Sequence, residues 1–493
     1  MNLLLPILQH ALQEPNRIAI SSKQGKLTYA ALVQRVRQVA QGIMQNGMNH
    51  DKIAILSTNR QEFVEVFLGA VYAGFVPVLL DPKWSSVELN EIIGQCQPSF
   101  IFAETAFASK ITLQSNDSQI IEFSDEPSCS YEKWLTRHQA APELNHPNEL
   151  LFIGFTSGTT GIPKGFMRTH LSWIRSFEAT NEAFQLVHLQ HFTAPGPFVH
   201  SLSLFALMQS LYNGATFHIV QQFNAAEVLS LCSNHSDMVL FAVPTMIDSL
   251  ISLTVPGHTH IQALISSGGT WSEHSKQRCR EVFNGVKLYE YYGSSEASYI
   301  SYLNVNEDNK LGSVGRPFTG VEISIRDEHF QEVAPGSIGQ LYIRSDMMFL
   351  GYYQLPEETA TVFQNGWLKT GDFMFIDSDG FLYMTGRSKN MMVTGGLNVI
   401  PEEVEAVLQR IPAIREVMVF GIPNHHWGEM VTAIVQWRGD QRLTIDELKA
   451  YCRENLASYK APKQLITVDQ FIYTSSGKIA RHAMKEYLKR VES

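Results

Sequence analysis

The feature that most constrains the fold is an alternation of short apolar runs with helical patterns, which extends from the start of the chain to about residue 290. Residues 52–56 and 75–80 are apolar runs of strand length, and residues 61–73 between them have the periodicity of an amphipathic helix. A second helical pattern spans 86–96, and further apolar runs follow at 99–102, 216–220, 238–243, 263–265 and 287–289. This strand–helix–strand repetition predicts a parallel sheet covered by helices on both faces.

From residue 311 onward the pattern changes. Residues 321–326, 340–344 and 381–385 alternate apolar and polar side chains, which predicts a small antiparallel sheet or barrel. After residue 387, helical patterns at 401–408 and 445–456 mix with apolar runs at 417–420, 431–437 and 464–468. The expected fold is therefore α/β: a large N-terminal domain of parallel α/β sheet subdomains plus a small β-barrel, followed by a small α+β C-terminal domain.

Composition and charge restrict the class of protein. The chain has 493 residues, 44% hydrophobic and 17% charged, as in a globular protein with a large core. Its formal net charge of −10 argues against nucleic-acid binding, which needs basic patches. We find no signal-peptide pattern, and the longest uncharged apolar stretch, residues 66–80, is too short to span a bilayer. The five cysteines are scattered without a Cys-x-x-Cys pair: Cys96, Cys129, Cys232, Cys279 and Cys452. This pattern is typical of a reducing compartment, so we expect a cytoplasmic protein with no transmembrane segment.

The strongest local motif is a stretch rich in glycine and hydroxyl residues. It lies between an apolar run at 150–155 and a helical pattern that begins near Thr169. Glycines let backbone N–H groups turn toward a polyphosphate, hydroxyls add donors, and a lysine adds positive charge. The stretch lacks the Walker spacing. It predicts a phosphate-binding loop rather than a surface turn, with the following binding residues: Thr156, Ser157, Gly158, Thr159, Thr160, Gly161 and Lys164.

Further motifs follow this loop in order along the chain. They lie at 291–296, 370–372, 386–389, 394–405 and 475–479. Together with the loop they resemble the motifs of the adenylate-forming superfamily, which includes acyl-CoA synthetases, peptide-synthetase adenylation domains and firefly luciferase. The resemblance implies activation of a carboxylate on ATP. Negative charge then develops on both sides of the α-phosphorus, and catalysis is mainly electrostatic and positional.

The resemblance implies a role for each matching residue. Glu296 would be the Mg²⁺ ligand, since this ion prefers hard oxygen donors, and Ser295 beside it keeps the hydroxyl of the threonine that is usual there. Tyr292 would lie against adenine, Asp372 would accept hydrogen bonds from the ribose hydroxyls, and Lys478 would reach the α-phosphate and the acyl carboxylate. The same comparison adds these residues to the nucleotide pocket: Ser267, Gly268, Gly269, Tyr291, Gly293 and Arg387.

The resemblance also implies a domain movement between two half-reactions. Residues 1–387 would form the body that binds ATP and the acyl group. Residues 388–389 would form a hinge, in which Lys389 is the hinge residue, and residues 390–493 would form a mobile cap that carries the catalytic lysine.

Two adjacent glycines after the hinge bear on the acceptor of the acyl group. Gly395 and Gly396 match the version of this loop seen in CoA ligases, where small residues let the backbone approach a narrow pantetheine arm. After adenylation the cap would rotate, so that Lys478 leaves the site and this loop enters it. The simpler interpretation is a glycine turn before a helix that begins at Pro401.

The acyl side is marked by residues 197–201, which resemble an element of acyl- and aryl-CoA synthetases. A histidine there, His200 in this chain, borders the acyl pocket, and Ser203 stands where glycine is common. Amino-acid-activating relatives carry an aspartate hereabouts that pairs with the substrate's ammonium. None lies between Thr193 and Asp237, which argues against an amino-acid substrate because a buried ammonium without a partner is costly. A packed histidine with no catalytic part is the alternative for His200.

The remaining histidines predict no metal site. His188 with His191, and His258 with His260, lack a third ligand at a suitable spacing. We therefore expect uncoordinated histidines and a single metal ligand, Glu296.

We predict an ATP- and Mg²⁺-dependent acyl-CoA synthetase, an AMP-forming ligase. A carboxylic acid and ATP give acyl-AMP, and CoA then gives the thioester. A fatty acid is the default substrate, because the pocket segments supply no charge for a polar acid. The alternatives left open are an aryl acid, an acyl carrier protein as acceptor and, from a different class, a non-catalytic adenylate-binding protein, against which the retained lysine argues. The sequence leaves the oligomeric state open, a homodimer included.

Overall fold

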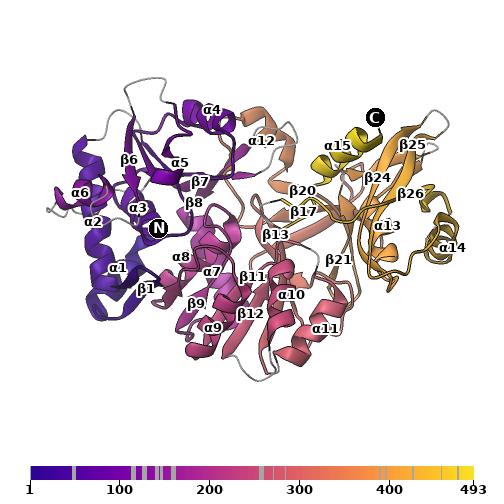
Figure 1. Ribbon diagram of the computed structural model, residues 1–493, viewed down its shortest axis with the longest axis horizontal. Helices are drawn as coiled ribbons and strands as arrows, with labels where there is room; N and C mark the ends of the chain where they lie inside the picture. The colour runs from indigo at the N-terminus through magenta and orange to yellow at the C-terminus, as the bar shows by residue number, and fades with distance from the viewer. Residues whose placement is uncertain are drawn as a thin grey trace. The chain divides into compact units, whose positions relative to one another are not determined.

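A computed structural model describes the chain from residue 2 to residue 492. It leaves out 47–50, 113–117, 125–129, 139–143, 145–147, 157–162, 255–259, 270, 284, 388–389, 395–396, 425–426, 457 and 475–476. The chain forms two compact units, which are described one at a time below (Figure 1). The first unit comprises Met1–Leu311, Pro317–Val321 and Arg344–Gly366, and the second comprises Gly312–Arg316, Glu322–Ile343 and Trp367–Ser493.

The first unit contains a seven-stranded sheet in the order β18-β8-β7-β4-β3-β5-β6. The pairings of β4 with β7, of β3 with β4 and β5, and of β5 with β6 are parallel, whereas β8 runs antiparallel to both β7 and β18. The strands are β3 (Lys52–Leu56), β4 (Val76–Leu80), β5 (Phe100–Glu104), β6 (Gln119–Phe123), β7 (Leu150–Thr156), β8 (Lys164–Thr169) and β18 (Gly351–Tyr352). The sequence pattern did not predict β8, which returns the chain along β7.

Helices cover this sheet. All residues of β3 after Lys52 are buried, so both of its faces are covered. Leu89 and Ile92 of α4 pack with Leu56 and Val78 in one apolar cluster, and α3 lies against β3 and β4. The helix α4 begins with a capping box between Ser85 and Glu88. The helices around this sheet are α2 (Tyr29–Asn46), α3 (Gln61–Tyr72), α4 (Ser86–Cys96), α5 (Thr105–Ala108), α6 (Ser130–Thr136) and α12 (Pro356–Val362).

The second sheet of the first unit includes strands in the order β14-β13-β12-β11-β9-β10-β1-β2. Pairs from β13 through to β1 are parallel, and the two hairpins β13–β14 and β1–β2 are antiparallel. The strands are β1 (Ile18–Ser22), β2 (Gly25–Thr28), β9 (His191–Thr193), β10 (Thr216–His218), β11 (Met238–Ala242), β12 (Ile261–Ser266), β13 (Lys287–Ser294) and β14 (Ser298–Asn304). The short strands β15 (Arg316–Pro317) and β19 (Phe363–Gln364) lie near boundaries between the units along the sequence.

Further helices pack around this sheet. Every residue of β11 is buried, which is typical of a central parallel strand. Figure 1 shows α9, α10 and α11 side by side along the strands β9, β11 and β12. The helices are α1 (Leu4–Gln13), α7 (His170–Phe184), α8 (Ser201–Tyr212), α9 (Ala225–Asn234), α10 (Pro244–Leu253) and α11 (Glu273–Val282). The helix expected near Thr169 is confirmed, because α7 begins at His170 and the Thr169 side chain caps it by accepting a hydrogen bond from the Ser172 amide.

The second unit contains an antiparallel sheet in the segment where alternation predicted one. Its strands β16, β17 and β20 follow in that order, β21 pairs with β20, and both β17–β20 and β20–β21 are antiparallel. The strands are β16 (Glu322–Arg326), β17 (Gly339–Arg344), β20 (Trp367–Ile376) and β21 (Leu382–Arg387).

The C-terminal part of the second unit is a sheet in the order β23-β22-β25-β24, with β26 beside β25. Alternation along β24 divides its core: Val417 and Val419 pack with α13 and α14, whereas Met418 and Phe420 pack with α15. The elements are β22 (Met392–Thr394), β23 (Leu397–Val399), α13 (Pro401–Leu408), β24 (Ile414–Asn424), β25 (Gly428–Trp437), α14 (Ile445–Asn455), a 3₁₀ turn (Ser458–Lys460), β26 (Gln464–Thr467) and α15 (Arg481–Glu492).

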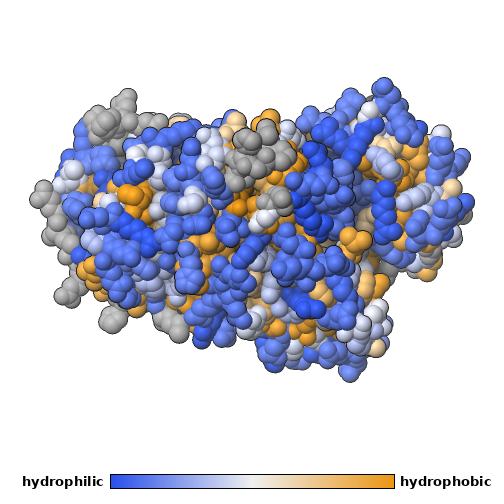
Figure 2. All heavy atoms as spheres, turned by 90° about the horizontal axis from the view of Figure 1, so that it is seen from below, coloured by the Kyte–Doolittle hydropathy of each residue, from blue (hydrophilic) through white to orange (hydrophobic). Residues whose placement is uncertain are grey.

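The surface agrees with the composition. On the face drawn in Figure 2, hydrophilic residues predominate and hydrophobic residues appear in groups between them. Among the described residues, no helix combines the length and the apolar character that a bilayer crossing requires.

Candidate active site

The ends of the predicted phosphate loop are held by a strand pair. β7 ends at Thr156 and β8 begins at Lys164, and these two residues are register partners across the antiparallel pair. The loop therefore starts and finishes at neighbouring points of the sheet. The predicted binding residues from Ser157 to Gly161 lie outside the described residues.

The lysine of the loop has an acidic partner. Lys164 Nζ forms an ion pair with a carboxylate oxygen of Glu358, which belongs to the first turn of α12. Both side chains are partly exposed, so the pair is open to exchange with solvent or with a competing anion. A phosphate that binds Lys164 would therefore have to replace the Glu358 carboxylate.

Glu296, the predicted magnesium ligand, lies in the turn between β13 and β14. The Tyr352 hydroxyl donates a hydrogen bond of 2.9 Å to Glu296 Oε1, and the Phe349 amide donates one of 2.7 Å to the Glu296 carbonyl. Burial, and then the negative charge of Glu296, raise the pKa of Tyr352 well above its usual range. The tyrosine is therefore a permanent donor that orients a part-buried carboxylate.

A buried arginine supports the same turn. Arg168 of β8 is 2% exposed; its Nη2 donates to the Met347 carbonyl at 2.6 Å and its Nη1 to the Ser295 carbonyl at 3.2 Å. Burial lowers the pKa of Arg168 to about 9, and the charge of Glu296 opposes this shift. The arginine ties the backbone of the Ser295–Glu296 turn to the strand that follows the phosphate loop.

The residues predicted for the adenine side gather where β12 ends and β13 runs beside it. Ser267 follows β12, and the ring of Tyr291 stacks on that of Tyr299 at 4.3 Å between centroids. Burial raises the pKa of Tyr291. Tyr292 is buried and, as the next residue along β13, points to the opposite face of the strand.

Two glycines of these motifs occupy positions that need glycine. Gly268 has φ +87°, in the left-handed region, and Gly269 follows it. A side chain at Gly293 would place its Cβ 2.0 Å from the Ser298 carbonyl oxygen, so the β13–β14 hairpin closes tightly only around glycine. This turn carries Ser295 and Glu296, so the close approach defines their position.

The predicted acyl-side histidine has a carboxylate neighbour. His200 is the N-cap residue of α8, and its Nε2 lies 3.7 Å from Asp81 Oδ2. Asp81 directly follows β4 and is 8% exposed. The two side chains form an ion pair only when the histidine is protonated. Sequence reasoning missed Asp81, although its place at the carboxyl end of a buried parallel strand is a usual position for site residues.

The backbone before His200 is fixed by a buried asparagine. Asn59 Nδ2 donates to the carbonyls of Gly196 at 2.7 Å and Val220 at 3.0 Å, and Asn59 Oδ1 accepts from the Phe198 amide at 2.7 Å. Ser203, the departure noted in the sequence, is buried, and its Oγ lies 2.6 Å from the place a Cβ on Gly196 would take. This serine fills space above the turn that leads to His200.

In the second unit, Asp372 lies at an irregularity in β20. Across β17 and β20, Gln340 pairs with Phe373 and Tyr342 pairs with Lys369. The three residues 370–372 of β20 therefore lie opposite a single residue of β17. Gly371 has φ +79°, and the Asp372 amide donates to Thr370 Oγ1 at 3.1 Å. Such bulges re-aim side chains and are frequent beside active sites.

The region before the predicted hinge is also in the second unit. Arg387 is the register partner of Asp372 across β20 and β21, so the two predicted ribose-side residues lie on neighbouring strands. A Cβ on Gly386 would lie 1.6 Å from Ile400 Cγ2. Only glycine at this position therefore lets Ile400, the residue after β23, pack against β21. Lys389, Gly395 and Gly396 lie outside the described residues. The strands on either side of the two glycines pair as a hairpin, with Thr394 opposite Leu397.

Lys478 stands on a tight turn with an exposed side chain. The Thr474 amide donates to the Lys478 carbonyl at 2.7 Å, the Lys478 amide donates to Thr474 Oγ1 at 3.2 Å, and Gly477 takes φ +79°. Behind it, Arg481 pairs with Glu405 of α13 and donates to the Val419 carbonyl at 3.0 Å. The lysine is therefore presented by a turn that is fastened to the C-terminal sheet.

Comparison with known proteins agrees with this geometry. The family model of the AMP-binding enzymes matches residues 7–353, and that of the AMP-binding enzyme C-terminal domain matches residues 403–478. The Bacillus subtilis protein YhfT, an uncharacterized acyl-CoA ligase, is 32% identical over 96% of both chains, and Staphylococcus aureus VraA, a putative long chain fatty acid-CoA ligase, is 32% identical over 100% of both. The structure of o-succinylbenzoate CoA synthetase from B. subtilis with its acyl-adenylate intermediate superimposes with a TM-score of 0.85 at 28% identity, covering 97% of each chain.

The chain therefore belongs to the AMP-binding enzymes, that is, to the adenylate-forming superfamily. Within it, the chain belongs to the acyl-CoA synthetase branch and is an AMP-forming acid–CoA ligase that uses ATP, Mg²⁺ and CoA. The donor set fits these groups: a part-buried carboxylate at Glu296 suits Mg²⁺, and a lysine-ended loop between paired strands suits a polyphosphate.

Proposed function

We propose that this ligase activates a fatty acid and transfers it to CoA. One observation carries the choice of an apolar acid: Phe198, two residues before His200, is buried between Phe63 at 5.4 Å and Phe217 at 5.8 Å, centroid to centroid. Apolar side chains beside the segment that leads to His200 favour an apolar acyl chain over a charged one. The similarity to VraA, a putative long chain fatty acid-CoA ligase, supports the same substrate class.

The proposed first half-reaction is attack of the carboxylate on the α-phosphorus of ATP. The carboxylate–phosphorus bond forms, the bond to pyrophosphate breaks, and acyl-AMP remains. Lys164 and the loop hydroxyls bind the β- and γ-phosphates, and Glu296 holds the Mg²⁺ that neutralises developing charge. Tyr292 and the 267–269 turn bind adenine, and Asp372 binds the ribose.

Lys478 is the proposed catalytic residue of that step. Its ammonium offsets negative charge on the α-phosphate and the carboxylate in the transition state. Such a group accelerates the reaction only if it acts more strongly there than on bound ATP. Residues 388–389, with Lys389, are the proposed hinge between a body (1–387) and a cap (390–493).

The proposed second half-reaction is attack of the CoA thiol on the acyl-AMP carbonyl, which forms the thioester and releases AMP. Gly395 and Gly396 have no side chains that would obstruct the pantetheine arm. His200, beside Asp81, borders the acyl group and orients it.

Two experiments test these proposals. A panel of fatty acids of increasing chain length, with benzoate and cinnamate as aryl acids, is assayed for AMP release with CoA, with an acyl carrier protein and with neither. We expect the highest kcat/KM with a fatty acid and CoA. A preference for an aryl acid, or turnover only with the carrier protein, would refute the substrate or the acceptor proposed.

The second experiment tests the lysine. Replacing Lys478→Ala should lower acid-dependent pyrophosphate release by at least about 100-fold, since one charge-stabilising group is worth about 2.7–4 kcal/mol at a transition state. The matched control is Lys449→Ala in α14, which removes a partly exposed lysine paired with Asp446. Equal activities of the two variants would show that Lys478 is not catalytic.

A further inference from the structure

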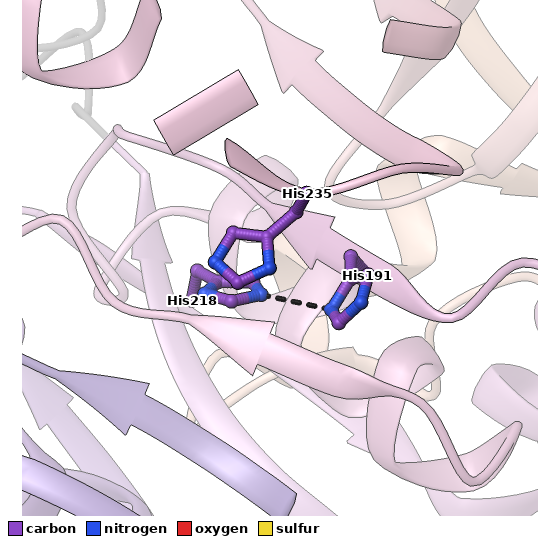
Figure 3. A group of neighbouring side chains, drawn as sticks. All are labelled: His191, His218 and His235. Carbon is purple, nitrogen blue, oxygen red and sulfur yellow. Dashed lines mark hydrogen bonds between the residues drawn. The ribbon is translucent and has the colours of Figure 1, made fainter. Parts of the chain in front are cut away.

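Three histidines from three separate elements meet in the first unit. His191 is the first residue of β9, His218 is the last residue of β10, and His235 is the C-cap residue of α9. One ring nitrogen from each lies within 4.8 Å of the others. Figure 3 shows the three rings facing one another, with His235 across the pair formed by His191 and His218. The expectation that His191 lacks further histidine partners is therefore wrong.

The order of the sheet explains why these residues meet. β9 lies between β10 and β11, and His191 is the register partner of both Thr216 and Met238. His218 is two residues beyond Thr216 on β10, so the side chains of Thr216 and His218 lie on the same face of the sheet. Because Thr216 is the register partner of His191, the side chain of His191 lies on that face as well. α9 ends just before β11 begins, which brings His235 over the same position.

We propose that His191, His218 and His235 form a binding site for a divalent transition-metal ion, with Zn²⁺ as the representative. Imidazole nitrogen is a preferred ligand of Zn²⁺, Cu²⁺ and Ni²⁺, and three of them leave a position for water or an anion. Tetrahedral Zn²⁺ with bonds of 2.0–2.1 Å separates its nitrogen ligands by about 3.3 Å. His191 Nδ1 and His218 Nε2 are 3.0 Å apart, already close to this spacing.

The protonation of the rings suits a metal. Burial, reinforced by the neighbouring histidines, lowers the pKa of His218 to about 3, and burial also lowers the pKa of His191 and of His235. The neutral imidazole is the form that binds metals. Both close nitrogens can face one ion when each ring carries its proton on its other nitrogen, which requires a change of tautomer and no loss of a proton.

Charges around the cluster are mixed. The positive charge of Lys26 lowers the pKa of His218 and of His235, and that of Arg17 lowers the pKa of His191. Both charges therefore disfavour a bound cation. The carboxylate of Asp237 acts on His191 in the opposite direction and is exposed near the cluster. Its negative charge opposes the effect of Arg17 on His191.

A metal here would cross-link the sheet to a helix. His191 begins β9, His218 ends β10, and His235 is the C-cap residue of α9. The bound ion would hold β9, β10 and the end of α9 together. We therefore expect stabilisation of the first unit, distinct from the Mg²⁺ requirement of adenylation.

The test uses the full-length chain without a histidine tag, treated with a chelator and then freed of it. Zn²⁺ is titrated calorimetrically in the presence of saturating Mg²⁺, and Co²⁺ is titrated as a spectroscopic probe. We expect a single tight ion per chain, a Co²⁺ visible spectrum of nitrogen ligation, and a rise in melting temperature with Zn²⁺. His235→Ala, at a part-buried position, should weaken binding at least about tenfold and remove the rise in melting temperature.

His188→Ala is the matched control, since it removes an exposed histidine three residues before His191 and should bind Zn²⁺ like the unmodified chain. The far-UV spectrum of each variant checks that it folds, and His235→Gln keeps the site polar if alanine disturbs it. Equal Zn²⁺ affinity of the unmodified chain, His235→Ala and His235→Gln would overturn the proposal. So would an unmodified chain that binds no Zn²⁺, because the trio would then be a hydrogen-bonded packing cluster.

Discussion

Removal of one hydroxyl tests whether Glu296 is a magnesium ligand that its surroundings orient. Tyr352→Phe deletes the 2.9 Å hydrogen bond to Glu296 Oε1 and keeps the ring, which packs edge-on against Phe349 at 5.0 Å. A hydrogen bond to a charged group contributes about 1.5–3 kcal/mol. Because Glu296 is only part-buried, the lower end applies, which corresponds to about a tenfold change in an equilibrium constant.

We expect this loss to appear as a higher Mg²⁺ concentration for half-maximal pyrophosphate release, by about 10-fold, as for other residues that orient metal ligands. Tyr352 stays protonated well above neutral pH because its pKa is raised by burial and by Glu296. The effect should therefore be the same from pH 7 to pH 9.

The neighbouring tyrosine provides the control. Tyr353→Phe removes a hydroxyl that accepts a hydrogen bond from Gln354 Nε2 at 3.1 Å and does not involve Glu296. It should leave the Mg²⁺ dependence unchanged. If Tyr352→Phe lowered the melting temperature but kept the Mg²⁺ half-saturation within twofold of the unmodified chain, the hydrogen bond would be structural and the reasoning would be wrong.

Three further predictions concern the loop lysine, the CoA step and the hairpin. Glu358→Gln removes the ion pair of the loop lysine, and because a partly exposed pair contributes about 0.5–1 kcal/mol, the KM for ATP should fall about two- to fivefold; an unchanged or higher KM would show that the pair does not compete with phosphate. Gly396→Trp should spare acyl-AMP formation and block thioester formation, measured as separate half-reactions, and equal loss of both would count against a pantetheine path there. Gly293→Ala should lower the free energy of unfolding by about 1–3 kcal/mol in a denaturant titration, because its Cβ would meet the Ser298 carbonyl oxygen. Gly94→Ala, within α4 and with nothing within 4 Å of its Cβ, should instead be neutral or stabilising.

Local patterns were sufficient to place many of the strands and some of the helices. The pattern at 52–56 is β3, that at 86–96 is α4 and that at 401–408 is α13, with the same bounds. Such segments can be predicted from the sequence because side-chain periodicity and helix caps involve residues only a few positions apart. The strand β8 was not predicted, because the glycine-rich motif before it indicated a loop that leads directly into a helix.

The supporting residues of the candidate site could not be predicted from the sequence. Tyr352 is 56 residues from Glu296, and Arg168 is 127 residues from Ser295. Neither residue is part of a motif, and each acts through a contact that exists once β8, β18 and the β13–β14 turn are assembled. Asp81 is the exception, since its place after β4 was a signal that could have been used.

By itself, the sequence determined the class of the enzyme, because each motif that resembles the adenylate-forming superfamily consists of residues that are consecutive in the chain. The antiparallel return of β8, the donor on Glu296 and the meeting of His191 with His218 and His235 were decided by tertiary structure. The physical reason is that the order of strands in a sheet and their register bring distant residues together, and no periodicity along the chain records that order.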